Sequence, residues 1–281
     1  MSPLLFTVLL FFLSAAGGFL GSLAGIGGGI IVVPALTLLF GVDIHLAIGA
    51  SIVCVIATST AAAAAYVREG MTNVRVGMFL EMGTVTGALI GATLGGILNP
   101  GLLFILFGAI VGYSALMMLK QVGKGIGSSV AAENRISKWL NLNGSYYDQA
   151  VGKEIPYKVA HPLIGGVLMI FAGMVSALLG IGSGSLKVPV MDIAMKLPIK
   201  VSSATSNFMI GVTAAASSMI YFARGDINPF LAAPTAVGIT LGALIGTRVM
   251  TRMHSRSLRI LFVFLFFFIG IQMIWKGFGT L

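Results

Sequence analysis

The chain has 281 residues, of which 57% are hydrophobic and 9% are charged, and its formal net charge is +9. A soluble domain usually carries about 25% charged residues, and one soluble monomer could not bury the apolar surface that a mean hydropathy of +1.03 implies. This composition excludes a soluble enzyme, a nucleic-acid-binding protein and a disordered tail, and it predicts a polytopic membrane protein. In that class, excess Lys and Arg usually marks cytoplasmic loops.

Eight apolar segments follow one another along the chain, and a membrane-spanning helix needs about 20 such residues. They lie at residues 3–41, 46–67, 76–98, 102–119, 160–195, 201–223, 230–250 and 257–275. A polar stretch at 121–158 separates the first four from the last four, so we expect a solvent-side linker there. The chain then divides into a membrane repeat at 1–120, the linker at 121–158 and a second membrane repeat at 159–281. No basic region precedes the first segment, so we expect it to remain in the protein.

The first and fifth apolar segments are too long for one helix, and the same motif interrupts both. Gly-Ile-Gly-Gly-Gly at 25–29 is followed by Pro34, and Gly-Ile-Gly-Ser-Gly at 180–184 is followed by Pro189. The offset of 155 residues continues beyond the motif, because 19 of the 67 positions from 25 to 91 are identical to their counterparts without a gap. The chain is therefore an internal duplication.

The basic residues predict how the two copies are oriented. If each glycine-broken segment crosses the membrane once, the Lys and Arg of the loops divide 10 to 6 between the two sides. If each segment returns as a hairpin, they divide 14 to 2, with only Arg224 and Lys276 on the second side. The positive-inside rule favours the hairpin. We therefore expect an all-α polytopic membrane protein of two inverted repeats, each a glycine-broken re-entrant helical hairpin plus three transmembrane helices. Both termini are then extracytoplasmic and the linker is cytoplasmic.

The glycine breaks predict an anion site. A helix begins after each break, at about Ile30 and at about Ser185, and its first N–H groups lack intrahelical partners at the positive end of the helix dipole. In inverted copies both N-termini point inward, as in several transporter folds, and form an anion site built from backbone. The candidate residues are Gly27, Gly28, Gly29, Ile30, Gly182, Ser183, Gly184 and Ser185. The alternative is a tight turn that binds nothing. No strand, acidic ribose partner or P-loop Lys follows, which excludes a nucleotide fingerprint.

Polar side chains after the breaks are further candidates. Ser51, its counterpart Ser206 and Asn207 can donate to an anion, although Ser and Thr in membrane helices also bond their own backbone or join helices. Lys187 lies three residues after the second break, where the first copy has Val32. It is either the counter-charge of an anionic substrate or a lysine that snorkels to the interface.

Glu81 lies inside the third apolar segment, and it is either a proton-coupling carboxylate or an interfacial acid near Arg75. The three histidines, at 45, 161 and 254, lie near membrane ends and far apart in the sequence. We find no set of nucleophile, base and orienting group, and Cys54 is the single cysteine, so we expect no enzyme, no metal site and no cofactor.

The motif Gly-Ile-Gly-Gly-Gly-Ile-Ile-Val-Val-Pro at 25–34 and its copy at 180–189 resemble the duplicated signature of the sulfite exporter TauE/SafE family, and the similarity covers essentially the whole chain. The resemblance implies export of sulfite or small organosulfonates, such as sulfoacetate, across the bacterial inner membrane. It leaves proton coupling and a homodimer open. The partners are then a small anion and the lipid bilayer, with no nucleic acid.

Two departures from the symmetrical family pattern leave the substrate open. Ser183 replaces a glycine in the second copy, and Lys187 has no counterpart in the first. Thiosulfate or another anion is therefore an alternative substrate. A passive anion channel and a scaffold or lipid-binding protein are the alternative classes.

Overall fold

The computed structural model describes residues 2–119, 135–182, 184–253 and 255–280. Its first half contains α1 (Pro3–Ala24), α2 (Gly29–Pro34), η1 (Ala35–Leu39), α3 (Ile44–Arg68), α4 (Val74–Gly95) and α5 (Pro100–Leu119). The linker contributes α6 (Arg135–Trp139), β1 (Gly144–Asp148) and β2 (Lys153–Tyr157). The second half contains α7 (Pro162–Leu179), α8 (Gly184–Pro189), η2 (Val190–Ala194), α9 (Ile199–Arg224), α10 (Pro229–Arg252) and α11 (Ser255–Thr280).

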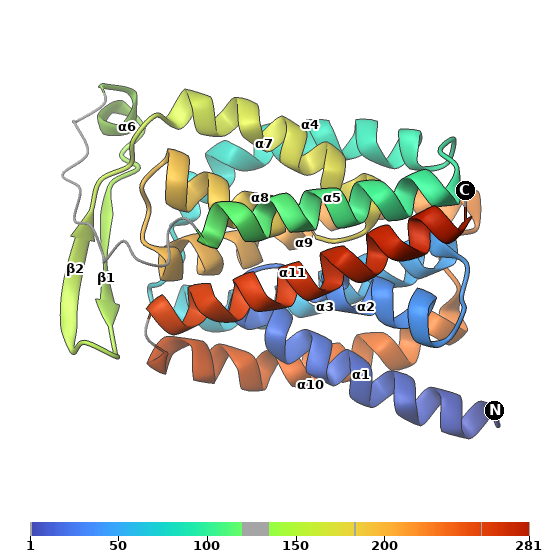
Figure 1. The fold of residues 1–281 in the computed structure, drawn as a ribbon. Helices are drawn as coiled ribbons and strands as arrows, with labels where there is room; N and C mark the ends of the chain where they lie inside the picture. Colours follow the sequence, from blue (N-terminus) through green and yellow to red (C-terminus); the bar gives the residue numbers. More distant parts are fainter. Residues whose placement is uncertain (1, 120–134, 183, 254, 281) are drawn as a thin grey trace.

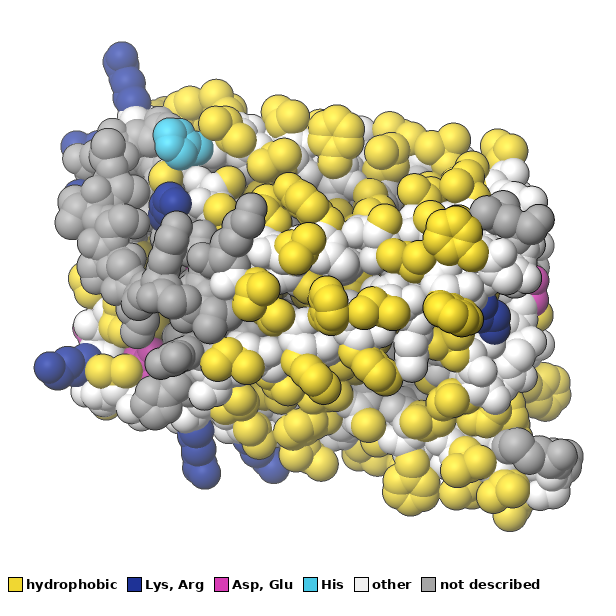
Figure 2. All heavy atoms as spheres, viewed as in Figure 1, with side chains coloured by type: hydrophobic (Ala, Val, Ile, Leu, Met, Phe, Trp, Pro, Cys, Tyr) yellow, Lys and Arg dark blue, Asp and Glu magenta, His cyan; other side chains and the backbone are white. Residues whose placement is uncertain are grey.

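The helices form a polytopic membrane bundle. Within the described ranges, seven helices are long and apolar enough to cross a membrane. Figure 2 shows hydrophobic side chains covering the middle of the molecule, while most of the visible Lys and Arg gather at the end that carries the β-hairpin. Apolar side chains that face outward along the bundle, such as Phe12, Met82 and Phe264, lie where lipid tails would contact them. The predicted class of membrane protein is confirmed.

The helices break at the two glycine motifs, as predicted. α1 ends at Ala24 and α2 begins at Gly29, while α7 ends at Leu179 and α8 begins at Gly184. Both starts lie one residue before the predicted ones. After each break a six-residue helix ends in a proline and continues as a five-residue π-helical turn. Proline lacks the N–H that an α-helical bond needs at this point, which is a common cause of such a change.

Both chain ends lie at one end of the bundle and the β-hairpin lies at the other (Figure 1). α1 runs inward from the end that carries the termini, and α2 turns back toward the same end (Figure 1). The two arms are unequal, because α1 has 22 residues whereas the returning arm has six in α2 and five in η1.

Helices of one half pack on helices of the other. α1 packs on α10, α4 on α7, α5 on α11 and α3 on α9. Glycines make two of these contacts possible: a Cβ on Gly87 would lie 1.9 Å from the carbonyl oxygen of Ile170, and one on Gly242 would lie 1.9 Å from that of Ala15. Small residues allow such close approach of membrane helices. Gly87 and Gly242 are 155 residues apart, and so are Ala15 and Ile170, so the duplicated sequence makes the same contact twice.

The linker folds into an element that the sequence did not predict. β1 and β2 form an antiparallel hairpin, in which Gly144 faces Tyr157 and Asp148 faces Lys153. The side-chain amide of Asn73, at the start of α4, donates to Leu142 O at 2.7 Å and to the Tyr157 hydroxyl at 3.0 Å. The all-α expectation is therefore incomplete, since it omitted this small sheet.

A buried ion pair fixes the hairpin to α9. Lys200 Nζ donates to Asp148 Oδ1 at 2.8 Å, and both side chains are almost fully buried. Burial acts to raise the pKa of Asp148, but the hydrogen bond and charge of Lys200, with the Ala150 N–H and the Tyr146 hydroxyl, hold the pKa below its ordinary value. A lowered folded-state pKa means that the pair stabilises the fold above about pH 4. That stabilisation is lost as the pH falls through the folded-state pKa.

We predict that Asp148→Asn lowers the free energy of unfolding by about 3–5 kcal/mol, because it leaves the Lys200 ammonium buried without its counter-charge. The double variant Asp148→Asn, Lys200→Met should recover most of the loss. Thermal unfolding of the purified protein in detergent measures both variants. Wild-type stability in the single variant would contradict a buried pair at this position.

Candidate anion site at the glycine breaks

The two glycine breaks contact each other backbone to backbone. Gly27 and Gly28 have φ of +73° and +77°, a region that L side chains rarely adopt. A Cβ on Gly184 would lie 1.9 Å from the carbonyl oxygen of Gly25, and one on Gly29 would lie 2.5 Å from that of Gly180. Any side chain at these positions would push the breaks apart, so glycine is required for the approach.

Two serines join the breaks across the halves. Ser51 Oγ donates to the carbonyl oxygen of Gly180 at 2.6 Å, and Ser206 Oγ donates to that of Gly25 at 2.6 Å. These two residues were predicted as donors to an anion. In this conformation each hydroxyl hydrogen satisfies a carbonyl that the break would otherwise leave without a partner. A direct contact of Ser51 and Ser206 with an anion stays a proposal.

The carbonyls at the ends of α1 and α7 also receive side-chain donors. Asn207 Nδ2 donates to Ser22 O at 2.9 Å, while its Oδ1 has no hydrogen-bond partner among the described residues. The Tyr66 hydroxyl donates to the same oxygen at 3.1 Å, and the Tyr221 hydroxyl donates to Ala177 O. The two tyrosines are counterparts at the 155-residue offset, but the sequence analysis gave them no role. Their exact repetition in the duplicated apolar segments was the signal that could have indicated one.

Aliphatic side chains lie against both breaks. The N–H groups of Ile31 and Val32 donate to Gly28 O, so those of Gly29 and Ile30 precede the first bonds of α2. A Cβ on Gly27 would lie 3.0 Å from Ile210 Cγ2 and 3.2 Å from Val55 Cγ1, and one on Gly182 would lie 3.1 Å from Val55 Cγ1. Val55 and Ile210 are counterparts in the two repeats; in this conformation Val55 lies against both breaks and Ile210 against the first.

The second break adds a buried hydroxyl. Ser185, in the first turn of α8, is fully buried, and its Oγ has no hydrogen-bond partner among the described residues. The Gly184 N–H donates to Gly182 O at 2.8 Å. The predicted site residue Ser183 lies outside the described residues.

Lys187 and Glu81, which the sequence proposed separately, lie together. Lys187 is fully buried, so it does not snorkel to the interface, and its Nζ lies 3.7 Å from Glu81 Oε2. The hydroxyl of Thr213 bridges the two: Lys187 Nζ donates to it at 2.7 Å, and it donates to Glu81 Oε1 at 2.5 Å. A long helical side chain points back toward the N-terminus of its helix, so the ammonium extends from α8 toward the break.

This ion pair joins the two halves, and the duplication does not repeat it. The counterparts of Lys187 and Glu81 at the 155-residue offset are Val32 and Ala236. Thr58, the counterpart of Thr213, donates to the Cys54 carbonyl of its own helix at 2.9 Å. The fold therefore does not need a charged pair at this position, because the equivalent position in the duplication has two uncharged residues.

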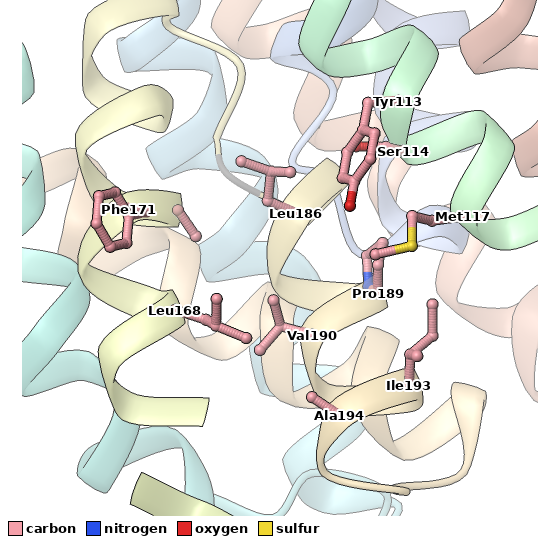
Figure 3. Close-up of a pocket in the computed structure, with 11 residues that line it drawn as sticks. Tyr113, Ser114, Met117, Leu168, Phe171, Leu186, Pro189, Val190, Ile193 and Ala194 are labelled. Atoms are coloured by element: carbon pink, nitrogen blue, oxygen red, sulfur yellow. The ribbon is translucent and has the colours of Figure 1, made fainter. Parts of the chain in front are cut away.

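An apolar cavity of about 190 Å³ lies beside the same half-helix, between α5, α7 and the α8–η2 segment (Figure 3). Leu168, Phe171, Leu186 and Val190 line it, and Ser114 uses its hydroxyl within α5. None of its lining side chains is charged, so it offers an anion no counter-charge. The breaks and the buried pair remain the better candidate.

Facing helix breaks and a buried charged pair inside a helical membrane bundle define a membrane transporter. The chain belongs to the sulfite exporter TauE/SafE family, whose model matches residues 10–273.

The chain is 29% identical over 279 residues to the "Probable membrane transporter protein YunE" of Bacillus subtilis, covering 96% of this chain and 98% of that protein. It is 27% identical over 245 residues to "Probable membrane transporter protein YdhB" of the same organism, covering 87% and 89%. A "Probable membrane transporter protein" of Xylella fastidiosa is 24% identical over 267 residues, covering 94% and 93%. No solved structure matches the chain.

We predict that Gly184→Ala destabilises the fold by roughly 1–3 kcal/mol, because the added methyl forces the two breaks apart. Gly112→Ala in α5 is the matched control, since a Cβ there would meet nothing within 4 Å. The control should be neutral or stabilising by up to about 1 kcal/mol. Thermal unfolding in detergent compares the two, and equal stability would contradict the backbone contact.

Proposed function

We propose that the protein exports sulfite or a small organosulfonate, such as sulfoacetate, across the bacterial inner membrane by alternating access around an anion site at the two glycine breaks. Thiosulfate is the alternative substrate. The observation that carries the proposal is the contact of the two breaks, because it brings two helix N-termini to one place inside the bundle. Helix N-termini attract anions through their free N–H groups and the helix dipole. The family of the chain and its transporter relatives support the same conclusion.

In this proposal the backbone makes the first contacts with the anion, and side chains of both halves add charge and donors. Lys187 supplies the positive charge and Glu81 the site of proton coupling. Ser51, Ser206 and Asn207 donate hydrogen bonds to the anion when the breaks move apart. The backbone contacts come from Gly27, Gly28, Gly29, Ile30, Gly182, Ser183, Gly184 and Ser185.

We further propose that residues 1–120 and 159–281 are inverted repeats that rock against each other. Two features support this. Helix pairs that correspond to each other in the duplication, α1 with α10 and α4 with α7, pack across the halves with matched glycine contacts, and the chain ends lie opposite the linker hairpin in Figure 1. With the excess of basic residues on the linker side, the positive-inside rule makes 121–158 cytoplasmic and both termini extracytoplasmic.

We predict opposite accessibility for cysteines introduced at Leu140 and Thr280 in a Cys54→Ala background. A membrane-impermeant maleimide added to intact cells should label position 280 alone, and lysis should expose position 140. Labelling of both from the same side would contradict the inverted arrangement.

Ser185→Ala gives a sharper test of the site. Because the Ser185 hydroxyl has no partner among the described residues, its loss should leave the unfolding temperature unchanged. A hydroxyl that bonds a charged ligand contributes roughly 1.5–3 kcal/mol, so the affinity for sulfoacetate should fall about ten- to hundredfold. Ser217→Ala is the control, since that hydroxyl donates within α9.

Calorimetry and flux in proteoliposomes measure these variants. Wild-type affinity in folded Ser185→Ala would remove Ser185 from the site, and failure of the wild-type protein to bind or move sulfite, sulfoacetate or thiosulfate would contradict the proposed function. Flux that only ever runs down the electrochemical gradient of the anion, with no dependence on a second ion, would indicate a channel.

A further inference from the structure

The buried pair formed by Lys187 and Glu81 is built as an exchangeable contact. We propose that the substrate anion and the Glu81 carboxylate compete for the Lys187 ammonium, so that each bound anion is accompanied by one proton on Glu81. This inference rests on the proposed function and adds the way in which the proton and the anion are coupled.

The geometry of the pair is loose for a structural ion pair. The 3.7 Å between Lys187 Nζ and Glu81 Oε2 exceeds the length of a direct hydrogen bond, and Oε2 has no hydrogen-bond partner among the described residues. The carboxylate is held instead through Oε1 by the Thr213 hydroxyl. An ammonium has three donors, and Lys187 directs one of them to Thr213. It therefore has donors to offer to a second acceptor without first breaking a direct bond to Glu81.

Lys187 is the charged side chain that faces Glu81. α7, which packs on α4, contains no titratable residue over Pro162–Leu179. α4 also packs on α9, whose charged residues lie at its two ends and are engaged there. These are Lys200, paired with Asp148, and Arg224, paired with Asp226. On α4 itself, Arg75 reaches out to the carbonyl of Asn141 in the linker.

Exchange conserves charge. Without substrate, the Lys187 ammonium and the Glu81 carboxylate balance each other. A monovalent anion that takes the ammonium leaves the carboxylate buried and unpaired, which is strongly unfavourable. A proton taken from water forms an O–H bond on Glu81 and removes that charge. Binding then adds one anion and one proton, with no net charge, while a divalent anion adds one net negative charge.

The exchange has a consequence for direction. Net transport of a monovalent anion follows the product of anion and proton concentrations on each side, independent of the membrane potential. Export then proceeds only while that product is larger in the cytoplasm than outside. A divalent anion carried with one proton additionally responds to the potential.

The test is a proton count on the full-length protein in detergent. Calorimetric titration with methanesulfonate, which does not titrate near neutral pH, is run in two buffers of different ionisation enthalpy. We expect the wild-type protein to take up about one proton per anion and its affinity to rise about tenfold for each unit by which the pH falls. Glu81→Gln should bind with no proton uptake and no pH dependence. Glu69→Gln, an exposed acid at the end of α3, should behave as wild type.

Each outcome separates the two proposals. Methanesulfonate or thiosulfate binding to the wild-type protein without proton uptake overturns the exchange and leaves the anion site intact. Proton uptake that persists in Glu81→Gln also overturns the exchange. No binding of methanesulfonate, sulfite, sulfoacetate or thiosulfate contradicts the proposed function itself. If Glu81→Gln does not fold, Glu81→Asp replaces it and should keep the proton uptake of the wild type, whereas uptake absent from both wild type and Glu81→Asp overturns the exchange.

Discussion

A backbone polar group inside a bilayer needs a hydrogen-bond partner, because no water is present to supply one. A helix that stops in mid-membrane exposes such groups at its end, and this chain does so twice. The carbonyl ends are satisfied by side chains, with Ser206 on Gly25, Ser51 on Gly180, and Tyr66 and Asn207 together on Ser22. The N–H groups at the start of the following half-helices are then the backbone groups of the breaks that could bind an anion.

Residues that the two copies share build the contact between the breaks, and residues that differ between the copies add charge and a buried hydroxyl. The two copies share three of the four motif glycines, the serines that join the breaks and the capping tyrosines, so these residues make equivalent contacts in both halves. The second copy alone carries Ser185 and Lys187, where the first has Ile30 and Val32. A charged group in one half gives the site a single counter-charge, which suits one small anion rather than two.

Much of the fold could be predicted because its signals are local. Runs of apolar residues gave the helices, and glycine runs gave the breaks to within one residue. The hairpin of β1 and β2 was missed, since its short strands lie in a polar stretch without a long alternating pattern. Tyr66 and Tyr221 are identical counterparts in the duplication, but the carbonyls that they bond lie on other helices and cannot be identified from sequence spacing.

Sequence analysis identified the individual residues of the candidate site but not which of them contact each other. Glu81 and Lys187 were each singled out because a charge within an apolar segment is costly. Nothing in a single sequence places α4 against α9 or brings Glu81 to Lys187 of α8, so their pairing through Thr213 could not be predicted. Likewise, the hydroxyls of Ser51 and Ser206 were identified as donors, while their acceptors in the opposite half depend on how the two repeats pack.

The central claim is that an anion binds where the two glycine breaks meet. Its most direct test is a crystal structure with selenite or selenate, heavier analogues of sulfur oxyanions, and location of selenium by anomalous scattering. The account predicts a peak beside the backbone of residues 27–30 and 182–185 and within about 4–6 Å of Lys187 Nζ, the range over which opposite charges interact strongly. Selenium found only against the exposed arginines at the linker end of α10, Arg248 and Arg252, would contradict it.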